Sequence, residues 1–111
     1  MPFDGLPEGK VCDIAKLRVA LAGVRKGWAS YRLGGPEARR HCAIGWLLEA
    51  TDWDRDATVR LALRYVYPAL PVTARGADRL QSIWSYNDGG GRKRVVQLFE
   101  DAVRLAERAV A

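Results

Sequence analysis

The sequence has 111 residues, of which 49% are hydrophobic and 28% are charged, values typical of one globular domain that buries a single core. No apolar run approaches the roughly eighteen residues that a membrane-spanning helix needs, and residues 1–10 lack the apolar core of a signal peptide, so we expect a cytoplasmic protein without a membrane anchor. The formal net charge of +5 favours encounters with acidic proteins or nucleic acid backbones.

Residues 1–10 are rich in proline and glycine and have no periodic apolar face, which predicts an extended or poorly ordered arm. Residues 11–111 are predicted to form one domain. Its first helix is expected to begin at Asp13, a suitable N-cap, and to end at Gly34 and Gly35. Its apolar stripe recurs every three or four residues and consists of Ile14, Leu17, Leu21, Val24, Trp28 and Tyr31.

The second helix is predicted to run from Pro36 to about Ala50, because proline is favoured in the first turn of a helix. Arg39 and Arg40 are expected on its outer side. Cys42 is expected near its inner side as a buried free thiol, since disulfides are uncommon in a reducing compartment.

A third helix is predicted after Asp52 or Asp54, either of which can serve as its N-cap. It is expected to end before Pro68, because the residue preceding a proline disfavours helical angles. Residues 59–67 also alternate like a β-strand, but we favour a helix, since no second strand pattern lies nearby to pair with it.

A shorter helix from Arg75 to Trp84 and a last helix from about Arg92 complete the predicted fold, an all-α, compact single-domain array of four or five short helices. Between them, Asn87 and Asp88 are expected to form a turn with the glycines and to cap the last helix through their side-chain oxygens. The buried stripe of the last helix is predicted to be Val95, Val96, Phe99, Ala102, Val103 and Ala106.

The segments HCAIGWLLEA and IWSYNDGGGRKRVVQLFEDAVRLAE together resemble a family of small uncharacterised bacterial and phage proteins. That family pairs a CAxGAL-like helix with a WND-like turn, which leads into a C-terminal VxxLxxA helix. Here Tyr86 precedes the Asn-Asp pair in place of tryptophan, and Trp46 stands where a small residue follows the glycine. The resemblance covers about half of the chain and implies a helical fold in a mobile-element setting, with no established activity.

The nearest approach to a catalytic pair is His41 beside Cys42, with Asn87 as an orienting third group, because imidazole can activate a thiol. Neighbouring residues on a helix diverge by about 100°, so these two side chains would not face each other. We expect a buried structural cysteine beside a partly exposed histidine. The protein is therefore predicted not to be an enzyme.

No metal ion or cofactor is expected. Asp52, Asp54 and Asp56 imitate the first half of a calcium loop, but Ala57 and Leu63 stand where that loop needs glycine and glutamate. One histidine and two cysteines lack the paired spacing of a zinc site. The GGGRKR segment lacks the Lys-Ser/Thr ending of a Walker loop.

The GGGRKR segment is nonetheless a candidate contact for an anion. It places Arg92, Lys93 and Arg94 in the first turn of a helix, where cations oppose the helix dipole. A phosphate or carboxylate bound to free backbone N–H groups would explain the placement. The alternative, which we favour, is a solvated helix start whose electrostatic cost is tolerated.

A second candidate surface lies on the first helix, where Arg18, Arg25 and Arg32 recur every seven residues and return to nearly the same face. Charged rows of this kind are also ordinary on the wet side of a helix. Trp53, next to the acidic turn, is the tryptophan that we expect to be exposed, and an exposed aromatic residue can anchor a protein partner.

The leading functional hypothesis is a non-enzymatic protein-binding module of phage or mobile-element type, acting as a regulator or inhibitor of a host defence system such as CRISPR. The alternative is a binder of nucleic acid backbones or of a small phosphate-bearing ligand through the basic helix surfaces. No helix-turn-helix, zinc-finger or RNA-binding signature accompanies those surfaces. The sequence fixes neither the partner nor the oligomeric state.

Overall fold

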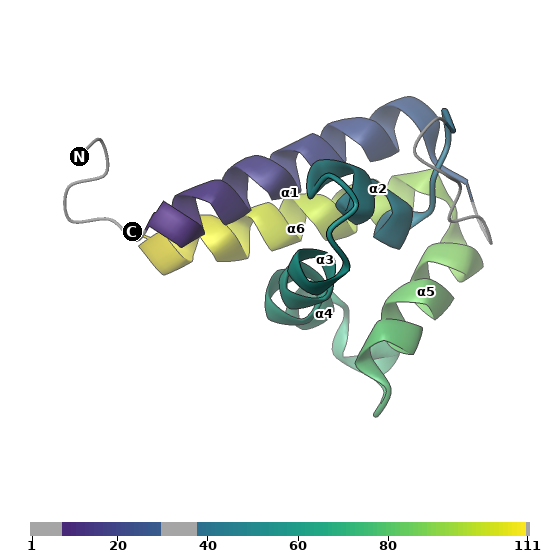
Figure 1. Ribbon diagram of the computed structural model, residues 1–111. Helices are drawn as coiled ribbons and strands as arrows, with labels where there is room; N and C mark the ends of the chain where they lie inside the picture. The colour runs from purple at the N-terminus through teal and green to yellow at the C-terminus, as the bar shows by residue number, and fades with distance from the viewer. Residues whose placement is uncertain (1–7, 30–37, 111) are drawn as a thin grey trace.

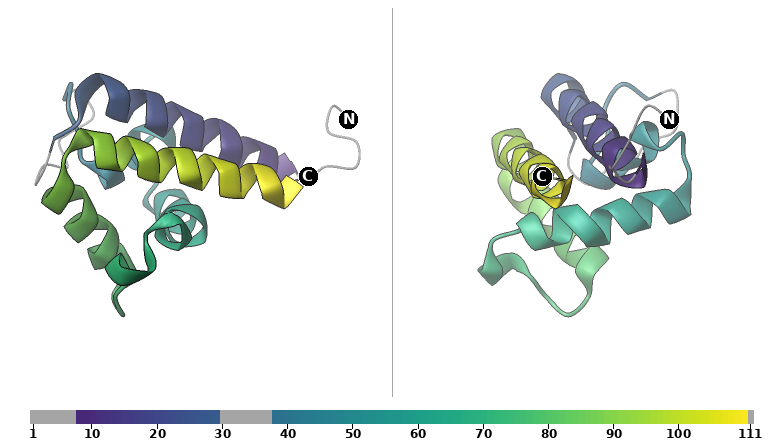
Figure 2. Two further views of the ribbon diagram at one scale, coloured as in Figure 1. Left: turned by 180° about the vertical axis from the view of Figure 1, so that it is seen from behind. Right: turned by 90° about the vertical axis from the view of Figure 1, so that its left-hand side faces the viewer.

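Two long helices, α1 (Glu8–Gly27) and α6 (Arg92–Val110), lie side by side and antiparallel along the molecule (Figure 1). The structure is a computed structural model that describes residues 8–29 and 38–110. Figure 2 shows from two further sides that the shorter helices gather on one side of this pair. The described residues form helices and no strand, so the predicted all-α class is confirmed.

The helical segments between α1 and α6 are, in chain order, α2 (Ala43–Ala50), α3 (Arg55–Leu61), η1 (Ala62–Val66), α4 (Tyr67–Ala69), η2 (Val72–Ala74) and α5 (Arg79–Gly90). η1 is a π-helical stretch that joins α3 to α4 in one continuous run, and η2 is a 3₁₀ turn. The radius of gyration is 13.4 Å, close to the roughly 13 Å expected of a 100-residue domain. The predicted compact array of four or five helices is therefore confirmed, with α4 as a short continuation of α3.

The start of α1 differs from the prediction. The helix begins at Glu8 rather than at Asp13, so residues 8–10 are helical and do not belong to an arm. The rest of the predicted arm, residues 1–7, lies outside the described residues. Asp13 is not an N-cap, because it lies inside the helix and its side chain is buried against α3 and η1.

Asp13 anchors α1 to the α3–η1 run. Its carboxylate accepts hydrogen bonds from Arg60 Nη1 (2.9 Å), Arg60 Nη2 (2.8 Å) and the Tyr65 hydroxyl (3.0 Å). Burial acts to raise the pKa of Asp13, but the hydrogen bonds from Arg60 and Tyr65 and the charges of Arg60 and Arg64 outweigh it, so the pKa lies below its ordinary value of 3.8. Burial and the bond to Asp13 raise the pKa of Tyr65. The charged form of Asp13 therefore stabilises the folded state.

α1 ends at Gly27, not at the predicted glycine pair, because another part of the chain crosses it there. Ala29 N donates to His41 O (3.1 Å), and His41 N donates to Gly27 O (3.0 Å). A Cβ atom on Gly27 would lie 2.3 Å from the Arg39 carbonyl oxygen, so this close crossing requires glycine. Trp28 is thus outside the helix, and the predicted stripe residue Tyr31 lies outside the described residues.

α2 begins at Ala43, later than the prediction from Pro36. Arg39 and Arg40 therefore precede the helix instead of lying on its outer face, and both are exposed. Cys42 is the N-cap residue of α2 and is buried, as expected, whereas Cys12 is exposed on α1; both are free thiols. Residues 30–37, which include Pro36, lie outside the described residues.

The third predicted helix is confirmed as a helix rather than a strand, but its end is not where the sequence predicts it. Asp54 is its N-cap, and its side chain accepts from Ala57 N at 3.0 Å. The run passes through Pro68, because Tyr67 N donates to Ala62 O five residues back. This wider π-helical turn accommodates a proline ring that a regular α-helical turn would exclude.

α5 also differs from the prediction at both ends. It begins after Asp78, whose side chain accepts from Gln81 N at 3.0 Å, and it continues through Gly90 instead of stopping at Trp84. Gly91 alone makes the turn into α6, with a φ of 95° that favours glycine. The segment expected to be a turn is therefore mostly helix.

The core lies between the long pair and the shorter helices, and its largest fully buried side chains include Leu17, Leu47, Leu61, Ile83 and Phe99. The stripe predicted for α6 is buried except at Val96, which is half-buried, and Leu98 joins it. Within residues 8–29 and 38–110, none of the helices combines the length and the hydropathy that a membrane span requires.

Candidate functional site

Asn87 and Asp88 do not form the predicted turn or cap α6, because both lie within α5. Asn87 is completely buried, and its Oδ1 accepts from Trp28 Nε1 (2.7 Å) and from Ala43 N (3.0 Å). It thus caps α2 from a distant helix, where Cys42 offers no side-chain hydrogen bond. Its Nδ2 donates to Asp88 Oδ1 at 2.9 Å. Asn87 therefore connects α5 to the end of α1 and to the start of α2.

His41 is completely buried, not partly exposed as the sequence predicts. It packs edge-on against Trp46 with ring centroids 4.7 Å apart, and its Nε2 lies 3.8 Å from Glu49 Oε2. His41 and Cys42 precede α2 and do not lie on a helix, so the predicted helical divergence of about 100° does not separate their side chains. Both residues are buried from solvent. That the protein is not an enzyme stays a prediction.

Trp53 is half-buried and packs against the core, so it is not the exposed anchor that the sequence predicts. Its Nε1 donates to Glu49 Oε2 (2.8 Å), and its backbone N donates to Leu48 O (2.7 Å). Asp52 and Trp53 adopt positive φ angles of 56° and 62°, which fold the acidic turn back onto α2. Among the described residues, no group of three or more His, Cys, Asp or Glu side chains could hold a metal ion.

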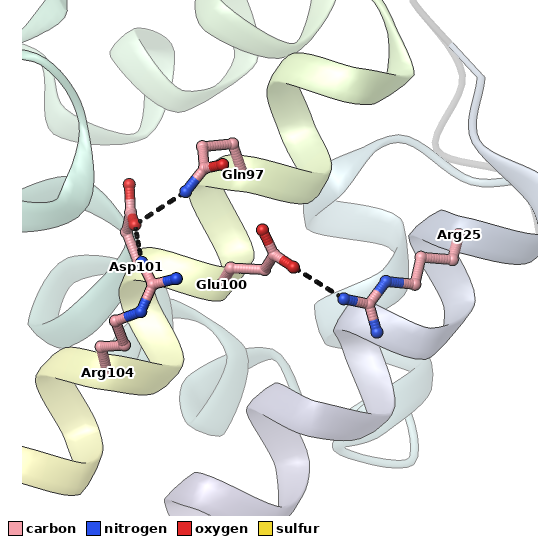
Figure 3. A network of polar contacts seen from close by, with 5 residues as sticks. All are labelled: Arg25, Gln97, Glu100, Asp101 and Arg104. Atoms are coloured by element: carbon pink, nitrogen blue, oxygen red, sulfur yellow. Dashed lines mark hydrogen bonds and ion pairs between the residues drawn. The ribbon is translucent and has the colours of Figure 1, made fainter.

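The basic row on α1 is partly neutralised by α6. Arg25 Nη2 donates to Glu100 Oε2 at 2.8 Å, as Figure 3 shows, and Arg18 pairs with Glu107 further along the two helices. The same figure shows Asp101 of α6 holding Gln97 and Arg104. Arg32, the third member of the row, lies outside the described residues.

The three cations of the GGGRKR segment separate in the structure. Arg94 turns back onto α5, where its Nη2 donates to Tyr86 O (3.0 Å) and its guanidinium lies 3.8 Å from the centre of the Tyr86 ring. Arg92 and Lys93 are exposed, and Arg92 Nη1 donates to Arg25 O in the last turn of α1 at 3.4 Å. The structure therefore brings Arg92 to Arg25, two residues from separate candidate surfaces.

An apolar groove that the sequence did not reveal opens between α2, α3 and α5. Its walls are Ile44, Leu48, Arg55, Thr58, Val59, Leu80 and Trp84, and its volume is about 220 Å³. The lining comes from three separate helices, so only their packing creates the groove. Val59, which belongs to the lining, is 38% exposed.

Comparisons with known proteins add no relative: no protein-family model matches the sequence, and neither the curated proteins nor the solved structures include a match. The resemblance drawn from the two sequence segments therefore stays a prediction.

Proposed function

We propose that this protein is a binding module whose site is the apolar groove between α2, α3 and α5. Its ligand is a protein segment that inserts one bulky apolar side chain into the groove and carries an acidic residue nearby. The observation that carries this proposal is an open groove whose walls are almost entirely apolar, contributed by Ile44, Leu48, Val59 and Trp84. Filling an exposed apolar groove with an apolar group is favourable, because it removes apolar surface from water.

The size of the groove favours a side chain over a small molecule. Sites for small molecules commonly have volumes of roughly 300–1,000 Å³. The groove has about 220 Å³, and an apolar cavity of roughly 150 Å³ is enough to hold a benzene ring. One leucine, phenylalanine or tryptophan anchor fits this space, and such anchored side chains dominate the energy of many protein interfaces.

The charge at the groove favours an acidic neighbour of that anchor. Arg55 lines the groove, is exposed, and makes no ion pair with any residue in the described part of the chain. Such a cation attracts a carboxylate on the partner and repels a basic residue. Because Arg55 is in contact with solvent, its effect is expected mainly on the association rate and on its salt dependence.

The biological setting of the partner rests on the sequence resemblance alone. A mobile-element protein that binds a component of a host defence system, such as a CRISPR effector, fits a small module with an apolar anchor site. A cytoplasmic location accompanies that setting. Both remain part of this proposal.

The test is a selection of linear peptides from a displayed library on the immobilised protein. Selected peptides should share one bulky apolar residue with an aspartate or glutamate close to it. Val59→Asp places a charge at the groove edge and should weaken the selected peptides about thirtyfold, the loss of one anchor contact of roughly 2 kcal/mol.

Val19→Asp is the matched control, because Val19 is an exposed valine (55%) of α1 outside the groove lining. It should leave peptide affinity unchanged. Arg55→Ala should slow association, with a larger effect at low salt. Peptides without an apolar anchor, or equal affinity for Val59→Asp and the native protein, would contradict the proposal.

A further inference from the structure

The end of the molecule where the last turn of α1 and the first turn of α6 meet gathers cations from three parts of the chain, and we call it the basic end. Figure 1 shows the C-terminal turn of α1, the N-terminal turn of α6 and the segment before α2 meeting there. The cations are Arg25, Lys26, Arg39, Arg40, Arg92 and Lys93, and all are exposed. The groove lining contains none of these residues.

Specific contacts hold these segments together. Arg92 Nη1 donates to Arg25 O, which fixes the first turn of α6 beside the last turn of α1. The backbone of Arg39 lies against Gly27, where a Cβ atom would be 2.3 Å from the Arg39 oxygen, and the adjacent pairing with His41 secures this segment. Arg40 is the next residue in the chain and is held in the same segment. The grouping is therefore built into the fold.

Within the described residues, the cations of the basic end mostly have no acidic partner. Arg25 is paired with Glu100, but none of the other five cations makes an ion pair with an acidic residue of the described chain. Lys26, in the last turn of α1, suits the helix dipole. Lys93, in the first turn of α6, opposes it. An external anion removes both the mutual repulsion of the cations and this penalty.

We infer that the basic end binds the phosphodiester backbone of a nucleic acid duplex. Four of the six cations are arginines, whose guanidinium groups match phosphate oxygens in pairs. Protein interfaces have an apolar centre, whereas nucleic acid interfaces are polar and strongly positive.

Stacking aromatics are the usual device for holding single strands. Trp28 and Trp46, the tryptophans near the basic end, direct their Nε1 groups inward to Asn87 Oδ1 and Gly27 O. Tyr86 is covered by Arg94. Trp28, Trp46 and Tyr86 are each only partly exposed, so the described part of the basic end offers exposed cations rather than exposed aromatic rings, which favours a duplex backbone read without regard to sequence.

The test measures binding of a fluorescent DNA duplex of arbitrary sequence by anisotropy at several salt concentrations. We assign one phosphate contact to each of the five cations of the basic end that make no ion pair within the described residues. Counterion release at five contacts predicts an affinity that falls about 500-fold between 50 and 200 mM salt. In the triple variant Arg39→Gln/Arg40→Gln/Lys93→Gln, two contacts remain and the same change in salt should cost about 12-fold. Its duplex affinity at 50 mM salt should also be far below that of the native protein.

The control is Arg64→Gln/Arg79→Gln/Arg108→Gln, which removes three exposed cations that lie on η1, α5 and the C-terminal part of α6. It lowers the net charge equally but should keep the native salt dependence. Equal losses in both triple variants, or no duplex binding at low salt, would overturn the inference. So would tighter binding to polyglutamate, to phosphatidylserine vesicles or to the single strand than to the duplex. Thermal melts of both variants establish that they are folded.

Discussion

Replacing Asp13 by alanine tests the ion pair that joins α1 to the α3–η1 run. Asp13 is 1% exposed and accepts three hydrogen bonds, two of them from Arg60 and one from Tyr65. Breaking a buried ion pair from one side commonly costs roughly 3–5 kcal/mol, because the remaining charge is left without compensation. The side chain of Arg60 is 45% exposed, however, so it can return to water and the cost is smaller.

The Tyr65 hydroxyl cannot turn to water in the same way, because Tyr65 is only 3% exposed. A buried hydroxyl without a partner costs about 1–3 kcal/mol, and the lost contacts to a charged acceptor add to it. Relief of the desolvation of the Asp13 carboxylate acts in the opposite direction. We therefore expect Asp13→Ala to lower the free energy of unfolding by about 2–4 kcal/mol, or the melting temperature by about 10–20 °C.

The assay is urea denaturation followed by circular dichroism, with Asp13→Asn as a milder variant that keeps the side-chain shape. Asp101→Ala is the control: Asp101 also accepts from Arg104 and Gln97, but its side chain is 40% exposed, so its removal should change stability by no more than about 0.5 kcal/mol. If Asp13→Ala were as stable as this control, the reasoning about the buried pair would be refuted.

Three further predictions concern stability. The pKa of Asp13 is lowered in the folded state, so the charged carboxylate stabilises the fold above pH 3.8, its ordinary pKa. This stabilisation is lost as the pH falls from 3.8 towards the folded-state pKa. Asp13→Asn should therefore show a free energy of unfolding that depends less on pH in acid than that of the native protein. Gly23→Ala should lower the free energy of unfolding by about 1–3 kcal/mol in urea titrations, because its Cβ would lie 2.2 Å from the Trp46 ring, and a co-substitution Trp46→Leu should restore part of the loss. Asn87→Ala leaves the buried Ala43 N and the partly buried Trp28 Nε1 without their acceptor and should cost about 2–4 kcal/mol by the same measurement. A change below about 0.5 kcal/mol would contradict the role of Asn87 as the distant cap of α2.

The site was less accessible to sequence reasoning than the fold. The sequence places Arg25 and Arg92 on separate candidate surfaces, and their contact depends on the antiparallel packing of two helices that are far apart in the chain. The groove could not be foreseen, because it is a gap among three helices whose apolar residues, such as Val59, look like ordinary core positions. Trp53 is half-buried rather than exposed as predicted, because positive φ angles in the acidic turn fold it back onto the core.

Local sequence alone determined that the chain is helical. The 3.6-residue spacing of apolar residues in α1 and α6 and the capping side chain of Asp54 act over one or two turns, so they can be recognised without a fold. Tertiary contacts decided where helices stop. Gly27 ends α1 because another segment crosses it, and α5 runs through Asn87 because distant partners satisfy that buried side chain. The energy of a crossing or a buried polar group depends on what the rest of the chain brings to it.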